Sequence, residues 1–188
     1  MTTVGLDEAG RGPLAGPVYA AAVILPPDFP VETLNDSKKL TEPKRKEAAA
    51  LIMRRAAWGI ACAEASEIDR INILRASLLA MSRAWEALAA DFPEAVKEAG
   101  LSAVVDGLYC PSLPIPCKAV VKADAQVPAV MAASILAKTA RDRIMEMFSW
   151  FYPEYGYEKH KGYPTKAHRE AVVRYGPSPI QRLTFTVR

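Results

Sequence analysis

The sequence carries, at residues 4–25, the stretch VGLDEAGRGPLAGPVYAAAVIL, in which two apolar segments flank a polar turn. Residues 2–8 and 17–25 are rich in Val, Ile, Tyr and Ala, a composition that favours β-strands. The residues between them are rich in Gly and Pro, so the whole stretch predicts a hairpin. Asp7 and Glu8 come where the first predicted strand ends. Burying carboxylates there is costly unless another group compensates their charge.

The rest of the chain predicts an α/β domain. The apolar spacing and the turn residues predict a helix at 42–56, a strand within 58–66, one or two helices over 66–92, strands at 101–107 and 117–124, and helices at 127–151 and near 165–175. Strands dominate early, and strands and helices alternate in the middle of the chain. This order predicts a mixed sheet with a helical C-terminal portion. A length of 188 residues suggests a single domain over residues 1–188, or one domain with a small appendage.

The composition narrows the class of protein. Hydrophobic residues make up 51% of the chain, and no apolar run approaches the roughly 20 residues that span a bilayer. The N-terminal residues lack a basic region followed by an apolar one, so we expect no signal peptide and no membrane contact. The three cysteines lack zinc-like spacing and are expected to be reduced thiols of a cytoplasmic protein. A net charge of +3 says little about partners, because its distribution matters more.

Three predicted strands each run into an aspartate: Asp7 in VGLDE, Asp106 in AVVDG and Asp124 in VVKAD. In an open sheet these side chains could gather at one edge, where they would repel one another unless cations neutralised them. Carboxylate oxygens favour Mg²⁺ or Mn²⁺. With Glu8, four carboxylates could hold two such ions and support two-metal phosphoryl transfer. The alternative for each single aspartate is a turn former or helix cap.

The segment GLDEAGRGPLAGPV resembles the N-terminal signature of ribonuclease HII, the type 2 ribonuclease H family. Similar blocks follow in the family's order: LNDSKKL (34–40), EIDRINILRASLLAMSRA (67–84), VVDG (104–107), VVKADA and MAASILAKTARDR (within 120–143) and YPEYGYEKHKGYPTKAHRE (152–170). The resemblance implies a ribonuclease H-like fold, with a mixed five-stranded sheet flanked by helices. It also implies that a helical portion at about 150–188 contributes to substrate binding.

The resemblance further implies an activity and its cofactors. The family's four metal-binding, catalytic acids fall on Asp7, Glu8, Asp106 and Asp124, which implies two Mg²⁺ or Mn²⁺ ions. The implied activity is endonucleolytic cleavage of RNA in RNA–DNA hybrids, and cleavage on the 5′ side of single ribonucleotides embedded in duplex DNA. The products would carry a 3′-hydroxyl and a 5′-phosphate. By resemblance alone, we also expect a monomer.

The resemblance also assigns residues to substrate binding. The backbone of Gly10, Arg11 and Gly12 would sense the 2′-hydroxyl, which distinguishes RNA from DNA. Tyr163 matches a tyrosine that stacks near the sugars at the RNA–DNA junction. The remaining family positions for substrate contacts are Asp36, Ser37, Lys38 and Asn72. Without the resemblance, Gly-Arg-Gly reads as a hairpin turn and Tyr163 as a surface aromatic residue.

Some features depart from the family pattern or leave alternatives open. Ala123 stands where the family usually has Gly, which predicts a slight shift of Asp124. The ending QRLTFTVR lacks the family's common Arg-Ser-Phe and matches sliding-clamp-binding peptides only in part. One rival is the related type 3 enzyme, which typically carries an extra N-terminal domain. Another is a non-catalytic nucleic-acid-binding member of the fold, which a missing carboxylate would indicate; all four are present.

Other residues receive structural or electrostatic interpretations. Basic groups such as Lys138, Arg141 and Arg143 are candidates for contacts with phosphates. His160 and His168 are predicted to lie on the surface of a loop and a helix. Residues 150–152, Trp-Phe-Tyr, are predicted to anchor the helical tail.

Overall fold

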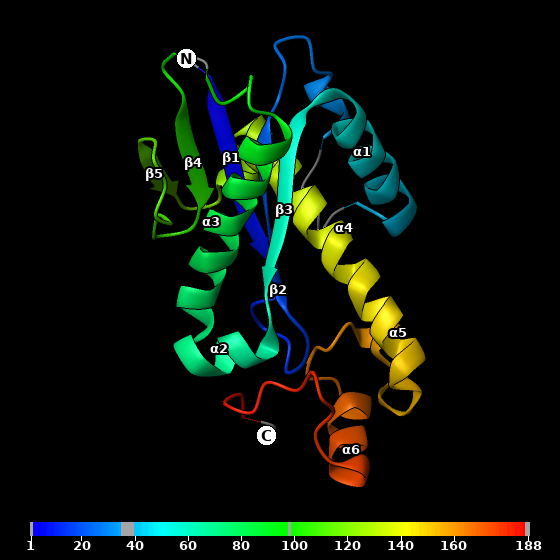
Figure 1. Ribbon diagram of the computed structural model, residues 1–188. Helices are drawn as coiled ribbons and strands as arrows, with labels where there is room; N and C mark the ends of the chain where they lie inside the picture. The colour runs from blue at the N-terminus through cyan, green and yellow to red at the C-terminus, as the bar shows by residue number, and fades with distance from the viewer. Residues whose placement is uncertain (1, 35–39, 98, 187–188) are drawn as a thin grey trace.

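The computed structural model describes residues 2–34, 40–97 and 99–186, and in this part five strands form one mixed sheet (Figure 1). The strands are β1 (Thr3–Ala9), β2 (Val18–Ile24), β3 (Ala57–Ala63), β4 (Ser102–Asp106) and β5 (Cys117–Val120). Their order in the sheet is β3-β2-β1-β4-β5. β2 is antiparallel to β1 and β3, whereas β4 is parallel to β1 and β5. The expected hairpin and mixed five-stranded sheet are therefore confirmed.

The helices follow the predicted periodicity closely. They are α1 (Glu42–Arg55), α2 (Ala65–Ile71), α3 (Ile73–Asp91), α4 (Pro128–Phe151), α5 (Tyr157–His160) and α6 (Lys166–Tyr175), with 3₁₀ turns η1 (Val31–Thr33), η2 (Ala123–Ala125) and η3 (Pro153–Tyr155). The predicted helical region 66–92 forms two helices, because Asn72 between them has a φ of 68° that an α-helix cannot accommodate. Across the described segments, no helix has the length and apolarity that crossing a bilayer requires.

Helices cover both faces of the sheet, and strand alternation decides which side chains meet them. Val4 and Leu6 of β1 pack in the core cluster that includes α3, whereas Gly5 and Asp7 face α4. A Cβ atom at Gly5 would overlap the backbone of Ala129 in the first turn of α4. The helix therefore lies directly on β1, two residues from Asp7 on the same face.

The C-terminal portion packs beyond one end of the sheet, where the chain between β1 and β2 meets it (Figure 1). Tyr157 and Ile180 pack there with Ala15 from this inter-strand loop. The Leu14 amide also donates to the Gly162 carbonyl at 2.8 Å. The prediction that residues 150–152 anchor this portion is wrong for Trp150 and Phe151, whose exposed fractions are 79% and 70%. Tyr152 does pack against its core.

Candidate active site

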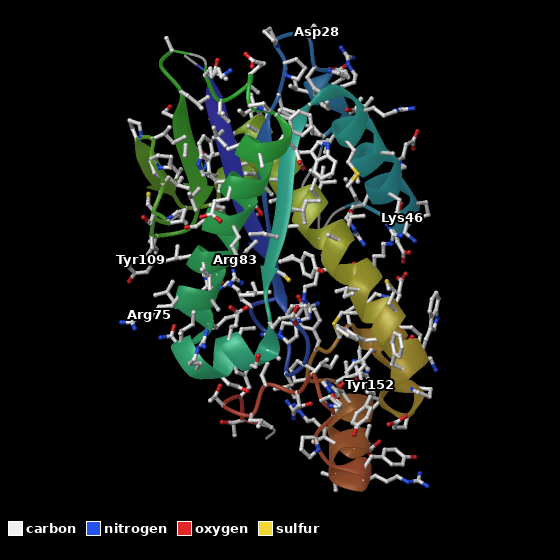
Figure 2. The ribbon with its side chains drawn as sticks, in the orientation of Figure 1. Asp28, Lys46, Arg75, Arg83, Tyr109 and Tyr152 are labelled. Carbon is white, nitrogen blue, oxygen red and sulfur yellow. The ribbon has the colours of Figure 1, made fainter. Side chains whose placement is uncertain are left out.

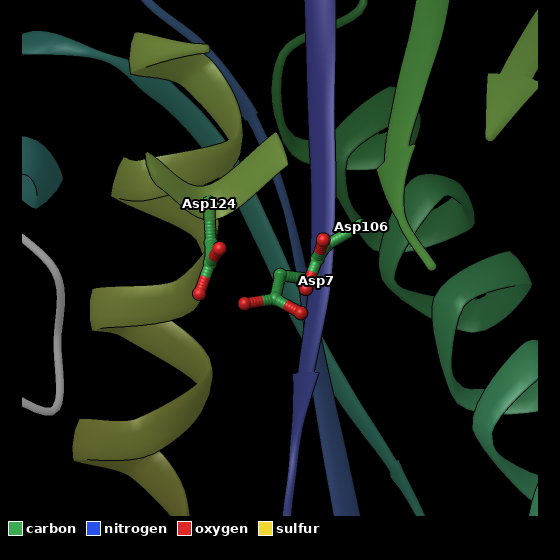
Figure 3. Close-up of side chains that lie close together, drawn as sticks. All are labelled: Asp7, Asp106 and Asp124. Carbon is green, nitrogen blue, oxygen red and sulfur yellow. The ribbon is translucent and has the colours of Figure 1, made fainter. Parts of the chain in front are cut away.

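Three carboxylates from distant parts of the sequence meet at one point on the α4 face of the sheet. One oxygen atom from each of Asp7, Asp106 and Asp124 lies within 4.8 Å of the others. Figure 3 shows the three side chains pointing toward one another, from β1, from the end of β4 and from the turn before α4. The structure therefore brings together three of the four acids that the sequence singles out.

The strand register explains why Asp7 and Asp106 are neighbours. Leu6 pairs with Val105 in the parallel β1–β4 ladder, so one further residue places Asp7 beside Asp106. Strand alternation puts both side chains on the face opposite to Leu6 and Val105. These two apolar residues lie in the α3-side core, which leaves the carboxylates on the α4 side.

Asp124 reaches the cluster in a different way from the one predicted. The sequence suggests a strand that ends near Asp124, but β5 ends at Val120 and Asp124 lies on the 3₁₀ turn η2. The Ala123 amide donates to Oδ1 of Asp106 at 2.9 Å, which ties this turn to the end of β4. Lys122 supplies the required left-handed residue, with φ 59°. Ala123 has no positive φ, so its backbone does not require the family's usual glycine.

The electrostatics of Asp7 favour a bound cation. Its exposed fraction is only 5%. Burial and then the neighbouring Glu8 charge raise the pKa of Asp7 well above its ordinary value of 3.8, and a hydrogen bond from Ser134 of α4 opposes this shift. A nearby divalent cation would compensate the buried charge, as the carboxylate cluster requires at neutral pH.

Glu8 lies beside this cluster but is paired with a cation of the protein itself. Glu8 follows Asp7 directly near the end of β1, and its side chain is 10% exposed. Its Oε1 accepts a hydrogen bond from Nη1 of Arg11 at 3.1 Å. Burial raises the pKa of Glu8, and Arg11 opposes the rise. Asp106 adds a smaller upward contribution, which shows that Glu8 is within electrostatic reach of the cluster.

The donor set fits hard divalent cations. Within the described residues the cluster contains three aspartates and no histidine or cysteine. Such an all-oxygen set suits Mg²⁺ or Mn²⁺, whereas zinc sites mainly use nitrogen and sulfur ligands. A Mg²⁺ ion uses only one or two carboxylates and keeps other positions for water or phosphate oxygens. The site is therefore suited to metal ions that also bind a nucleic-acid backbone.

The Gly10-Arg11-Gly12 loop follows directly from the strand that carries Asp7. Gly10 has φ 98°, and a Cβ atom there would overlap the side chain of Arg141. Only glycine fits at this position. Arg11 and Gly12 are exposed to solvent. A Cβ atom at Gly12 would lie 3.8 Å from Cε1 of Tyr163. The loop and the tyrosine, 151 residues apart in the sequence, thus border the same surface.

Tyr163 is held through its backbone, and the residue is 42% exposed. Its amide donates to the His160 carbonyl at 2.9 Å, and Nδ1 of His168 lies 3.0 Å from its carbonyl oxygen. The predicted surface position of His168 is wrong, because the side chain is fully buried and its ring stacks on that of His160 at 4.6 Å. The two imidazoles support the loop that presents Tyr163.

The remaining predicted substrate contacts lie elsewhere or outside the described residues. Asn72 is exposed between α2 and α3, and its Oδ1 accepts the Arg75 amide at 3.1 Å as a helix cap. Asp36, Ser37 and Lys38 are outside the described residues.

Two of the predicted phosphate-binding cations are not free side chains. Lys138 pairs with Asp142 at 2.7 Å. Arg141 is 1% exposed, so its interpretation as a phosphate contact is wrong. Lys46 on α1 lies at the surface (Figure 2) and is likewise paired, with Glu42 at 2.6 Å. Because Arg141 is buried, its guanidinium group lies in the interior and is not available to bind a phosphate.

Sequence reasoning missed Arg182, which is fully buried and donates to four carbonyl oxygens of the inter-strand loop. Burial is the largest cause that lowers the pKa of Arg182, to about 9, so the group is still a cation at neutral pH. Its partners are backbone atoms, which leave no residue pattern in the sequence.

The sheet order and the carboxylate cluster define a ribonuclease H-like α/β protein with a site for divalent metal ions. Solved structures share the fold. The RNase HII in the PCNA:RNase HII complex from Archaeoglobus fulgidus superposes with a TM-score of 0.76 at 22% identity, over 100% of this chain and 96% of that one. The ribonuclease H2 from Pyrococcus horikoshii OT3 gives 0.75 at 26% identity, over 100% and 95%. Bst-RNase HIII in complex with Mn²⁺ gives 0.78 at 18% identity, over 100% and 68%.

The sequence comparisons narrow this class to one family. The family model described as Ribonuclease HII matches residues 4–188. The Ribonuclease HII of Dechloromonas aromatica (strain RCB) is 55% identical over 182 residues, which cover 96% of this chain and 89% of the relative. That of Treponema denticola is 55% identical over 195 residues and 98% of both chains. The chain therefore belongs to the ribonuclease HII family, and it is a divalent-metal-dependent endonuclease with ribonuclease H activity on RNA–DNA hybrids.

Proposed function

We propose that this enzyme hydrolyses the phosphodiester on the 5′ side of a ribonucleotide, both in RNA–DNA hybrids and at single ribonucleotides in duplex DNA. The products carry a 3′-hydroxyl and a 5′-phosphate. One observation carries the proposal: Asp7, Asp106 and Asp124 converge next to a glycine loop, and Tyr163 borders that loop. The site thus combines a place for metal ions with groups that can contact a sugar.

The four acids have distinct roles in this proposal. Asp7, Asp106 and Asp124 supply oxygen ligands for two Mg²⁺ or Mn²⁺ ions, and Glu8 completes the set. Bound ions of this kind supply a hydroxide nucleophile and stabilise the leaving oxygen. Glu8 balances the Arg11 guanidinium at 3.1 Å when no cation is near. Ser134 and the Glu8 amide, which donates at 2.7 Å, orient the Asp7 carboxylate.

The loop and Tyr163 provide a way to recognise the ribose. The amides of Arg11 and Gly12 have no acceptor among the residues that the structure describes, and both residues are exposed. A 2′-hydroxyl oxygen can accept hydrogen bonds from such amides, whereas a deoxyribose offers no oxygen there. The Tyr163 ring stacks against the neighbouring sugar, and the side-chain amide group of Asn72 is available for a phosphate oxygen.

Other functions receive less support. The non-catalytic alternative predicts a damaged site, whereas the described acids form an intact cluster in a chain of an enzyme family. A clamp contact through residues 181–186 would have to release existing contacts, because Asp69 accepts the Leu183 and Thr184 amides at 2.9 Å. The PCNA complex is a property of the archaeal relative.

The proposal is tested by gel analysis of an end-labelled DNA duplex that contains one ribonucleotide. We expect cleavage with Mg²⁺ or Mn²⁺ and none with EDTA. Asp124→Asn should abolish cleavage and leave duplex binding largely intact, because phosphate contacts dominate affinity. Duplex binding by the wild type without any metal-dependent cut would favour the non-catalytic alternative. A cut that is indifferent to the ribonucleotide would contradict the proposed recognition.

A further inference from the structure

The loop of residues 10–17 turns almost all of its carbonyl oxygens into the protein. Arg182 donates from Nε, Nη1 and Nη2 to the carbonyl oxygens of Gly16 at 2.9 Å, Arg11 and Pro13 at 2.9 Å each, and Gly10 at 2.6 Å. The Arg182 amide donates to the Leu14 carbonyl at 2.8 Å. Arg141 of α4 donates to the carbonyls of Pro17 at 3.1 Å and Ala15 at 3.2 Å. Seven of the eight carbonyl oxygens in this loop thereby accept hydrogen bonds from Arg141 or Arg182.

These two arginines are unusual because they are buried cations with no ion-paired carboxylate in the part of the chain that the structure describes. Arg182 is fully buried and Arg141 is 1% exposed. Neither forms an ion pair with any residue of the described segments. Carbonyl dipoles of the loop accept hydrogen bonds from both guanidinium groups, and Asp69 and Asp142 act on these charges only from a distance. A buried cation is costly, and an apolar side chain would fill the same space at lower cost. The arrangement instead fixes the direction of the seven peptide units whose carbonyls are bound.

The direction of the peptide units matters for the ribose. A peptide plane places its N–H opposite to its C=O, so a loop whose carbonyls point inward presents amides outward. In the peptide that joins Gly10 to Arg11, the carbonyl oxygen accepts a hydrogen bond from Nη2 of Arg182. In the peptide that joins Arg11 to Gly12, the carbonyl oxygen accepts one from Nη1 of the same side chain. The amides of these same two peptides belong to Arg11 and Gly12. They are the amides that the proposed function assigns to the 2′-hydroxyl.

We propose that Arg182 is a positioning residue for ribose recognition, which holds the Arg11 and Gly12 amides outward by binding the carbonyls of the same peptides. This inference rests on the proposed function. A lysine cannot replace the arginine, because its single ammonium lacks the planar fork that serves four separate oxygens. The C-terminal segment thus contributes to specificity without contacting the substrate.

The test compares Arg182→Lys with Arg83→Lys as a matched control. Arg83 lies on α3 (Figure 2), donates to the Cys62 carbonyl at 3.0 Å and pairs with Glu67 at 2.8 Å. We measure kcat and KM on a single-ribonucleotide duplex, duplex affinity in Ca²⁺ and the melting temperature. Arg182→Lys should lower kcat by about 10- to 100-fold, since a displacement of about 1 Å costs that much, with KM and affinity nearly unchanged. Arg83→Lys should lower the melting temperature and leave kcat unchanged.

A second variant keeps the test decisive if Arg182→Lys does not fold. Asp69→Ala retains Arg182 but removes the half-buried carboxylate that accepts from the Leu183 and Thr184 amides at 2.9 Å. It should lower kcat several-fold in the same selective way. A folded Arg182→Lys protein, or a folded Asp69→Ala protein in its place, with wild-type kcat overturns the inference. If the wild type itself does not cut the single-ribonucleotide duplex, the proposed function fails instead, so the two failures are distinguishable.

Discussion

Replacing Asp7 with asparagine should stabilise the metal-free protein while it abolishes activity. The amide has nearly the shape of the carboxyl group and retains an oxygen that accepts from Ser134 and from the Glu8 amide. It removes a charge that is 5% exposed and close to Glu8 and Asp106. From the usual gain when an unfavourable buried charge is removed, we expect a free energy of unfolding higher by about 1–2 kcal/mol. For a chain of this length, that raises the melting temperature by about 2–8 °C.

Bound metal ions should instead make the wild type more stable than the Asp7→Asn variant. At a Mg²⁺ concentration of 100 times the dissociation constant, binding to the native wild type adds about 2.7 kcal/mol. The variant has lost a central ligand and should gain much less. Cleavage should fall by about 10³-fold or more, because the metal ions contribute several kcal/mol to transition-state stabilisation.

The assay is thermal unfolding of both proteins in EDTA and in Mg²⁺, with Asp28→Asn as the control. Asp28, labelled in Figure 2, is an exposed partner of Arg55. Its replacement should change the free energy of unfolding by no more than about 0.5 kcal/mol in either condition. The folded-state pKa of Asp7 is raised above 3.8, so the ionised side chain lowers the stability of the native state at neutral pH. This loss of stability fades as the pH falls toward 3.8. An Asp7→Asn protein that is less stable than the wild type in EDTA, or that gains as much stability from Mg²⁺, would contradict this prediction.

Three further predictions test other parts of the structure. Tyr163→Ala should lose about 10-fold in cleavage of a single-ribonucleotide duplex and much less on a long hybrid, because one stacking contact is lost; equal rates on both substrates would contradict its role. Gly59→Ala should lower the free energy of unfolding by about 1–3 kcal/mol in denaturant titrations, since its Cβ would overlap α3 at Ala84, and an unchanged midpoint would refute that packing. Burial lowers the pKa of His160 and His168 below 6.5, so these histidines bind more protons in the unfolded state than in the native state. Because Asp7 titrates in the opposite sense, the melting temperature is followed in the Asp7→Asn variant, where it should fall as the pH drops below about 6.5; a rise on acidification in that variant would contradict this.

The sequence predicts the part of the site that depends on strand geometry. Asp7 and Asp106 follow apolar runs of the right length, and parallel pairing of β1 with β4 then places them side by side. Asp124 is harder to place, because its position depends on the 3₁₀ turn and on the Ala123 amide that binds Asp106. Such a contact joins backbone to side chain across 17 residues, and no periodic pattern encodes it.

The support of the substrate-binding loop could not be predicted from the pattern of residues. Arg182 is one of 24 lysines and arginines, and nothing in its neighbourhood distinguishes a buried cation from a surface one. The same limitation applies to Arg141, which belongs to an otherwise regular amphipathic helix. Their burial depends on carbonyl groups that only the folded hairpin brings together, since the contacts span 124 to 172 residues.

The most direct test of the central claim is the position and chemistry of the cut. A duplex with one ribonucleotide, labelled at the 5′ end in one sample and at the 3′ end in another, is incubated with the wild-type protein and Mg²⁺. We expect a single cut on the 5′ side of the ribonucleotide, with a 3′-hydroxyl on one product and a 5′-phosphate on the other. A cut on its 3′ side, a cyclic or 3′-phosphate end, or equal cleavage in EDTA would contradict it.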